Sequence, residues 1–407
     1  MGALMGEYQV NTTDLRALGA RIRQARESTG WTQQELADHL GMSRTTIVAI
    51  EKGERRLKPA EIVQTASLLG RNVSDLLQRG APAEGFGVQL RATLPSSPAP
   101  ALLSHIGELQ RLCEDYIRLE EQCQAPLRRR YPPEYEIQGS DPELAAEDVA
   151  ASERRRLDLG DGPLMRLREI LEGDVGIRVF QLAMPSNVVG MFACTEPFGA
   201  CIAVNLHHPY ERRRASLAHE FGHFLTARHR PEITLEERFE RRPAGERFAE
   251  AFARSFLVPA PGLRRRFLAI QRERAKGFTY GDLCRLAHFY AVSVEAMTRR
   301  LEEVRLIPAG TRDRLRLERF RVREAQELLG LDTVHRDEEI FSPRYIALAV
   351  EAWQRGELSE GQLARILRTD RLGARETIQR LEGSAADGID ASEILDFGAP
   401  LAGTGTR

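Results

Sequence analysis

The chain has 407 residues, of which 42% are hydrophobic and 29% are charged, and its formal net charge is −1. That length leaves room for two or three domains, and the near-neutral charge means that any nucleic-acid surface must be local. No run of about 18 apolar residues is present, which excludes a membrane span, and the first ten residues do not read as a secretory signal. Five scattered cysteines without a CxxC pair favour a reducing cytoplasm over a disulfide framework. We therefore expect a cytoplasmic protein.

Residues 14–79 predict five short helices with a helix-turn-helix among them. Thr32 is placed to cap the helix QQELADHL, and Glu35, three residues on, completes a capping box. Gly41 suits the end of that helix, and Ser43 suits the cap of the next. Two short helices around a turn that contains glycine are typical of a helix-turn-helix.

In a helix-turn-helix the second helix enters the major groove of DNA by its N-terminal residues. We expect Arg44, Thr45 and Thr46 to reach the bases. Ser43 would then lie near the DNA backbone, and Gln33 would face a phosphate. The segment holds 11 Lys or Arg against 8 Asp or Glu, a modest local excess of +3.

The stretch WTQQELADHLGMSRTTIVAIEKGERRLKPAEIVQTASLLG resembles the Xre/Cro/lambda-repressor-like DNA-binding domain along its whole length. The resemblance implies binding to double-stranded operator DNA, usually as a homodimer on a two-fold site. A small helical bundle used for protein contacts is the alternative.

Two connecting segments follow the first domain. Residues 80–100 are rich in Gly, Pro, Ala and Ser, which predicts a flexible linker. Residues 101–139 begin with a helix that we expect to connect or dimerise. Its apolar residues recur at alternating spacings of four and three: Leu102, Ile106, Leu109, Cys113 and Tyr116. Two heptads do not require a coiled coil, so this stripe fits either a dimer seam or packing on the same chain.

Residues 216–227 read SLAHEFGHFLTA, in a helix expected to start after Pro209. His219 and His223 are one turn apart and project from one face, so both imidazoles can reach one metal ion. Glu220 lies beside the pair, where it can serve as a general base without being a ligand. This is the HExxH arrangement of zinc peptidases.

A catalytic zinc site needs a third protein ligand. The helix expected over residues 240–259 offers Glu246 and Glu250, four residues apart beside an apolar face. Either glutamate could be the ligand, with the other holding a histidine in place. A solvated, salt-bridging helix face is the alternative.

The run IAVNLHHPYERRRASLAHEFGH, followed by ERFAEAFARSFLVP, resembles the ImmA/IrrE family of metallopeptidases over roughly residues 140–305. The family's later helix reads E-x-x-x-(N/D)-x-x-A and ends in L-x-P. Aligned back from Pro259, its ligand falls on Glu246, and its Asn or Asp falls on Glu250, which is a departure. The resemblance implies a Zn²⁺ endopeptidase in which Glu220 takes a proton from the attacking water and passes it to the leaving amine.

The expected fold is mostly α with a small β-sheet. It has an N-terminal lambda-repressor-like five-helix domain, an α+β zincin-like metallopeptidase domain and a helical C-terminal region over residues 306–397. Short apolar runs before the HExxH helix predict strands at 177–183, 188–194 and 201–206. Residues 278–307 read as a second helix-turn-helix-like pair capped by Ser293, or as a packing pair that supports the active site.

Together these features predict a DNA-binding transcriptional regulator with a zinc-dependent endopeptidase. Its expected substrate is a helix-turn-helix repressor cut in trans, or its own 80–100 linker, in a stress or mobile-element response. A second interpretation is a transcription factor whose peptidase-like domain is a non-hydrolytic ligand sensor or dimerisation body, as in the short-chain fatty-acyl regulators. A third is a toxin–antitoxin-like or phage-related module that silences its own operon.

Overall fold

The computed structural model describes residues 12–69, 73–77, 90, 100–137, 139–196, 198–235, 243–273, 277–331 and 340–386. The chain divides into two compact units, Met1–Arg111 and Leu112–Arg407. Apart from Leu90 and Pro100, the expected linker lies outside the described residues. Within the described part of the chain, no helix is both long and apolar enough to cross a membrane.

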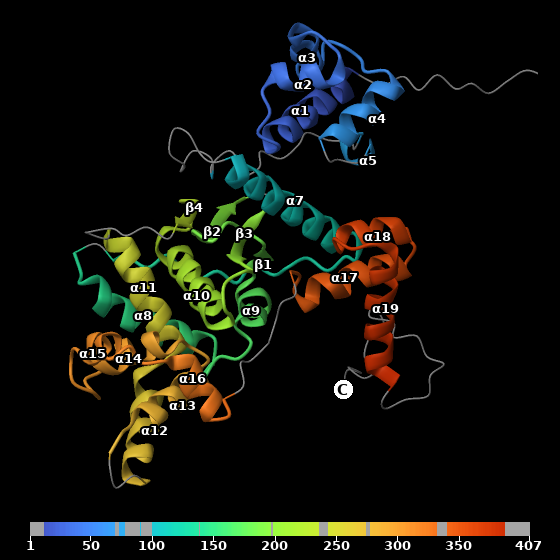
Figure 1. Cartoon of the computed structure of the whole chain (residues 1–407). Coiled ribbons are helices and arrows are strands. Elements are labelled where there is room, and N and C mark those ends of the chain that lie inside the picture. Colours follow the sequence, from blue (N-terminus) through green and yellow to red (C-terminus); the bar gives the residue numbers. More distant parts are fainter. Residues whose placement is uncertain are drawn as a thin grey trace, which may run out of the picture. The chain divides into compact units, whose positions relative to one another are not determined.

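The first unit contains short helices around a small apolar core that includes Leu36 and Ile47. Its helices are α1 (Thr12–Ser28), α2 (Gln33–Leu40), α3 (Arg44–Glu51), α4 (Pro59–Leu68) and α5 (Val73–Leu76) (Figure 1). The predicted capping box is present, because the Thr32 hydroxyl accepts from the Glu35 amide at 3.2 Å and the Glu35 carboxylate accepts from the Thr32 amide at 2.6 Å. Gly41 ends α2 in the left-handed conformation, with φ 64°. The predicted five-helix N-terminal fold is confirmed.

Helix α7 (Pro100–Gln122) continues from the first unit into the second. In the second unit, Cys113 and Tyr116 of α7 are fully buried. The Tyr116 ring lies edge-on to Phe180, with centroids 6.1 Å apart, and to Tyr345, with centroids 5.0 Å apart. This half of the apolar stripe therefore packs on its own chain.

A mixed four-stranded sheet lies in the second unit, in the order β1-β3-β2-β4. Its strands are β1 (Arg178–Leu182), β2 (Val188–Thr195), β3 (Gly199–Asn205) and β4 (Glu232–Leu235). Strands β1 and β3 are parallel, whereas β2 is antiparallel to both β3 and β4. The three predicted strands are present, and β4 is an edge strand that sequence reasoning missed. Its four half-buried residues are too few for a recognisable alternation.

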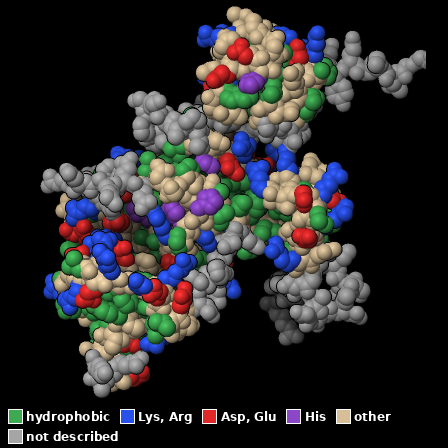
Figure 2. All heavy atoms as spheres, in the orientation of Figure 1, with side chains coloured by type: hydrophobic (Ala, Val, Ile, Leu, Met, Phe, Trp, Pro, Cys, Tyr) green, Lys and Arg blue, Asp and Glu red, His purple; other side chains and the backbone are tan. Residues whose placement is uncertain are grey.

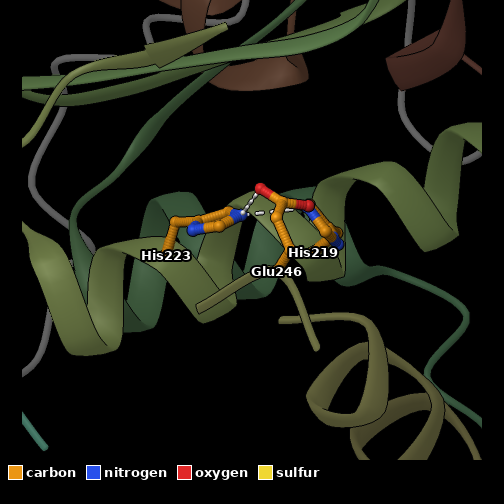
Figure 3. A group of neighbouring side chains, drawn as sticks. All are labelled: His219, His223 and Glu246. Atoms are coloured by element: carbon orange, nitrogen blue, oxygen red, sulfur yellow. Dashed lines mark hydrogen bonds and ion pairs between the residues drawn. The ribbon is translucent and has the colours of Figure 1, made fainter. Parts of the chain in front are cut away.

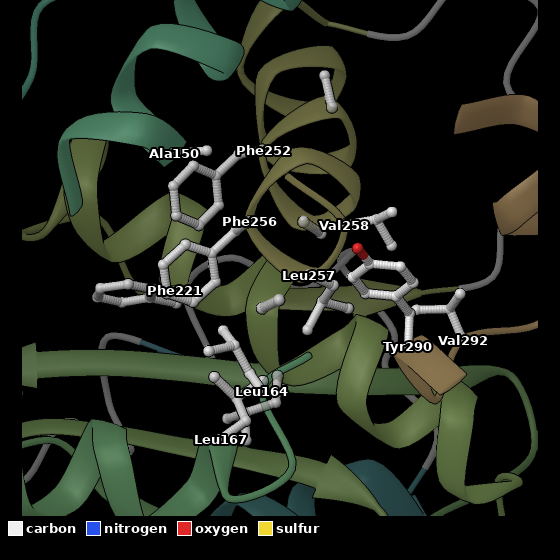
Figure 4. Packing of buried hydrophobic residues seen from close by; sticks show 14 of the residues in the cluster. Ala150, Leu164, Leu167, Phe221, Phe252, Phe256, Leu257, Val258, Tyr290 and Val292 are labelled. Carbon is white, nitrogen blue, oxygen red and sulfur yellow. The ribbon is translucent and has the colours of Figure 1, made fainter. Parts of the chain in front are cut away.

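Helices cover this sheet in layers: α10 (Tyr210–Ala227) packs on β2 and β3, α11 (Ala244–Leu257) packs on α10, and α8 (Pro142–Arg156) packs on α11. Phe221 of α10 lies between the layers, with ring centroids 5.7 Å from Phe252 and 5.6 Å from Phe256 of α11 (Figure 4). Gly222 lets the two helices approach, because a Cβ there would lie 3.1 Å from the Ala249 Cα. A fully buried aromatic layer thus holds α10 and α11 at close range.

The remaining elements are helical. They are α9 (Leu167–Ile170), the π-helix η1 (Leu171–Val175), α12 (Ala260–Glu273), α13 (Tyr280–Tyr290), α14 (Val294–Glu303), α15 (Thr311–Leu317), α16 (Val322–Leu328), α17 (Pro343–Gln354), α18 (Glu360–Ile366) and α19 (Arg371–Ala386). The C-terminal region expected over 306–397 is described as far as Ala386, mostly as helices. The predicted fold class, mostly α with a small sheet, is confirmed.

Helices α13 and α14 repeat the local pattern of α2 and α3. Thr279 and Asp282 form a capping box at the start of α13, and Ala291 ends it in the left-handed conformation with φ 49°. Ser293 then caps α14 by accepting from the Ala296 amide at 3.1 Å. Val294 of α14 is buried in the core of the second unit. This helix pair therefore packs into the core of the second unit.

Candidate metal centre

Two histidines of α10 meet at their ring nitrogens. His219 and His223 are 9% and 4% exposed, and their Nε2 atoms are 3.0 Å apart. Their spacing of one helical turn places both imidazoles on the same face of α10, as the motif predicts.

The first turn of α11 supplies a carboxylate to this pair. Glu246 Oε2 is 3.4 Å from His219 Nε2, and Glu246 Oε1 is 3.3 Å from His223 Nε2 (Figure 3). One ligand atom from each of the three residues lies within 4.8 Å of the others. The structure thus brings together the three side chains proposed as ligands from the sequence.

Glu250, one turn later on α11, lies elsewhere. Its Oε2 is 3.8 Å from Arg254 Nη1 and 3.5 Å from Arg299 Nη1. Glu250 was expected to hold a histidine if Glu246 is the ligand, but the further carboxylate at His223 is that of Glu232 of β4, whose Oε2 is 3.0 Å from His223 Nδ1. A carboxylate on Nδ1 fixes the proton there and turns Nε2 towards the centre. No spacing rule connects Glu232 to the motif, so Glu232 could not be predicted as part of the site.

The carboxylates and imidazoles of this group shift one another's pKa. Burial disfavours a charged imidazole at His223, but the hydrogen bonds that His223 donates to the carboxylates of Glu232 and Glu246 outweigh burial and raise the pKa of His223 to about 10. Burial likewise opposes ionisation of Glu246, yet the two histidines hold the pKa of this carboxyl well below its usual range. Two carboxylates around the imidazoles therefore make a strongly electronegative site, which suits a divalent cation.

Glu220 lies next to the histidines and is completely buried. Thr234 of β4 donates its hydroxyl to Glu220 Oε1 at 2.7 Å, whereas Oε2 has no hydrogen-bond partner among the described residues. Burial raises the pKa of Glu220, although His219 and His223 oppose the rise. One oxygen of the carboxylate is thus held in place, and the other is available to accept a proton.

The donor set and the buried carboxylate fit a catalytic metal. Two imidazole nitrogens and one carboxylate oxygen are the ligands of many hydrolytic zinc sites. Glu220, with an unpartnered buried oxygen beside them, is the group that such sites use as a general base. These ligand types are compatible with Zn²⁺.

A cleft of about 590 Å³ opens beside the centre. His219, Glu246 and Thr234 line it together with Glu250 and Arg299. Its far wall comes from the start of α14, through Ser293, Glu295 and Ala296. The face of α14 that corresponds to a DNA-reading face therefore borders this cleft.

The expected DNA-reading residues lie at the start of α3 in the first unit. Arg44 and Thr45 are exposed. The Ser43 hydroxyl caps α3 by accepting from the Thr46 amide at 3.2 Å. The Gln33 side chain donates to Glu51 Oε2 at 2.8 Å, so a buried carboxylate orients it.

Charge on the second unit is mixed. On the face that Figure 2 draws, Lys and Arg side chains are interspersed with Asp and Glu over α12 to α16. No broad field of one sign is visible there, unlike the surfaces with which proteins usually bind a DNA backbone.

Comparison with known proteins finds a match for each of two parts of the chain. Residues 17–77 match the helix-turn-helix domain, and residues 172–302 match the IrrE N-terminal-like domain, Peptidase_M78. An uncharacterized HTH-type transcriptional regulator of Methanothermobacter thermautotrophicus is 46% identical over 52 residues, which are 12% of this chain and 72% of that protein.

A solved structure, that of ComR from Streptococcus suis, aligns with 92% of this chain and 90% of its own at 13% identity. Its TM-score of 0.15 is too low to support any argument about this protein. The helix-turn-helix geometry and the matches above show instead that the chain belongs to the HTH-type transcriptional regulators and carries an IrrE N-terminal-like domain of the Peptidase_M78 family.

Proposed function

We propose that this regulator is a cytoplasmic zinc-dependent endopeptidase that binds operator DNA as a homodimer and cleaves a helix-turn-helix repressor in a stress or mobile-element response. The observation that carries the proposal is the convergence of His219, His223 and Glu246 within 4.8 Å. The buried carboxylate of Glu220 beside them supports hydrolysis over simple metal storage.

The residues of the centre divide the chemistry among them. His219, His223 and Glu246 would hold Zn²⁺, which would supply a Lewis acid to polarise the scissile carbonyl and lower the pKa of water. Thr234 holds Oε1 of Glu220, which leaves Oε2 to accept the proton of the attacking water. Glu220 then returns this proton to the nitrogen of the leaving amine.

The proposed substrate follows from the first unit. A chain that binds an operator is brought to the DNA where other repressors bind, so a repressor there meets the cleft at a high effective concentration. A cut within residues 80–100 of the same chain is the intramolecular form of the same proposal.

Replacement of Glu220 by Gln tests the chemistry while keeping the shape of the side chain. Both proteins are purified, their zinc content is measured, and each is incubated with candidate repressors. Fragments are then identified by gel and mass spectrometry. We expect about one zinc per chain in both proteins, cleavage by the parent, and no cleavage by Glu220→Gln. His219→Ala should lose zinc and cleavage together.

Two results would count against the proposal. Cleavage by Glu220→Gln would remove the assigned general base. A parent protein that binds DNA but holds no zinc and cuts neither repressors nor itself would favour the non-hydrolytic sensor.

A further inference from the structure

A second, smaller cavity borders the other face of α10. Its volume is about 40 Å³, enough for roughly three water-sized groups. None of its lining residues lines the metal cleft, and the cavity lies among α9, β1, β3 and the start of α10. The side chains used below are Arg168, Gln181, Tyr210, Arg213 and Arg214.

Arg214 is a buried cation with few partners. It is 4% exposed. Its Nη1 donates to the Tyr210 hydroxyl at 3.4 Å, and its guanidinium lies 5.5 Å from the centroid of the Tyr210 ring. Its Nε and Nη2 are shielded from solvent and have no hydrogen-bond partner among the described residues. No carboxylate in the described part of the chain forms an ion pair with it. A buried charge left in this state is costly, because neither water nor an anion offsets its lost hydration.

The surroundings increase the positive charge. Arg168 and Arg213 line the same cavity and are also buried, but their guanidinium groups donate to backbone carbonyl oxygens. Among the described residues at this cavity, two carboxylates are near. Glu169 lies exposed at the rim, and buried Glu172 interacts with Arg168. Three guanidinium groups around one small cavity therefore favour an anion.

Gln181 adds a second unsatisfied group to the wall. It is 5% exposed, and its side-chain oxygen is buried without a hydrogen-bond partner among the described residues. An oxyanion that also carries a proton can accept from Arg214 and donate to this oxygen. Hydrogen phosphate has both kinds of group, whereas acetate can only accept.

We propose that this cavity is a binding site for a small oxyanion, with phosphate favoured over carboxylate, and that Arg214 is its principal contact. The site is separate from the metal centre, although Arg214 and His219 are on the same helix, five residues apart. The phosphate can be the free ion or the end group of a larger ligand.

The test measures phosphate binding to the full chain by isothermal titration calorimetry, in chloride buffer at constant ionic strength. We expect Arg214→Met to raise the dissociation constant for inorganic phosphate by at least about tenfold, as the loss of a charge-assisted hydrogen bond predicts. A parallel titration with acetate separates the two chemistries: weaker binding of acetate supports the role given to Gln181. The same phosphate titration is carried out on His219→Ala. An unchanged dissociation constant for phosphate, which we expect, excludes binding at the metal centre.

Thermal unfolding without phosphate distinguishes a ligand-binding arginine from a structural one. Because two of the three guanidinium nitrogens of Arg214 have no hydrogen-bond partner among the described residues, Arg214→Met should unfold at the same or a higher temperature than the parent. The matched control is Arg154→Met, whose arginine is equally buried but donates to the carbonyl oxygens of Gly160 and Gly162. That variant should unfold at a lower temperature. The proposal is overturned if phosphate does not bind, if binding survives Arg214→Met, or if both variants are destabilised alike.

Discussion

Gly190 of β2 and Glu220 of α10 are in direct contact, and the lack of a side chain at Gly190 makes room for the carboxylate. A Cβ at Gly190 would lie 2.5 Å from Glu220 Oε1. That oxygen is at the end of a flexible side chain, so Gly190→Ala should fold but displace the proposed base. We expect zinc content to be unchanged and cleavage to fall by about 10²-fold, the loss typical of a misplacement near 1 Å.

The control for this variant is Gly173→Ala. A Cβ at Gly173 meets no atom within 4 Å, so that protein should cleave like the parent. Unchanged cleavage by Gly190→Ala would show that Glu220 does not need its present position.

The carboxylates around the histidines predict different effects on zinc affinity. Glu232 contacts His223 Nδ1, so Glu232→Ala should lower zinc affinity by about 10–100-fold, as loss of such a supporting carboxylate usually does. Glu246→Ala should lower it further, because a ligand is removed. Glu250→Ala is the matched control and should leave affinity unchanged, since Glu250 pairs with arginines. Competition with a chromophoric chelator measures all three, and a large loss in Glu250→Ala would reverse the ligand assignment.

Arg44 at the start of α3 is expected to contribute to the affinity for operator DNA. Arg44→Ala should weaken it by roughly 10–100-fold, the range expected for one arginine contact to a base. Fluorescence anisotropy with operator DNA at several salt concentrations measures the change. Arg321→Ala, which removes a similarly exposed arginine from the second unit, should bind like the parent. Equal losses in the two variants would refute a groove-facing Arg44.

An ion pair between α8 and α14 is expected to make the stability of the fold depend on pH. Burial raises the pKa of Glu147, but hydrogen bonds from Arg300 outweigh burial and lower the pKa below its usual value. The stabilisation is therefore complete above the unfolded pKa of about 4.3 and is lost as the pH falls through the lower folded value. Glu147→Gln should reduce the free energy of unfolding by about 1 kcal/mol at neutral pH.

Urea unfolding measures this difference, which should shrink as the pH falls below about 4. The comparison variant is Glu143→Gln, because the Glu143–Arg247 pair is largely exposed and should contribute little. A gap between parent and Glu147→Gln that stays constant with pH would contradict the assignment.

Local signals made much of this fold predictable. Thr32, Gly41 and Ser43 predicted where α2 ends and α3 begins, because caps depend on neighbouring residues alone. The HExxH spacing likewise predicted that His219 and His223 share a face. The choice between Glu246 and Glu250 needed the family pattern, since both glutamates lie on similar helix faces.

Contacts between distant segments could not be read from the sequence. Glu232 and Thr234 belong to a four-residue edge strand, too short to show a period, and their roles depend on its pairing with β2. The need for glycine at position 190 appears only in the fold, where β2 packs against α10. Arg214 reads as one of three successive arginines, and only the packed structure shows that it lacks the carbonyl partners of its neighbour.

The helix pairs α2–α3 and α13–α14 share a capping pattern but differ in their surroundings. Caps and a left-handed joint set the angle between two helices, but they do not determine what the outer surface of the second helix touches. In the first pair that surface carries Arg44 and is open to solvent. In the second pair it borders the metal cleft. Counting sequence motifs alone would therefore give this regulator two DNA-binding helix pairs, although the second helix of the two pairs has different surroundings.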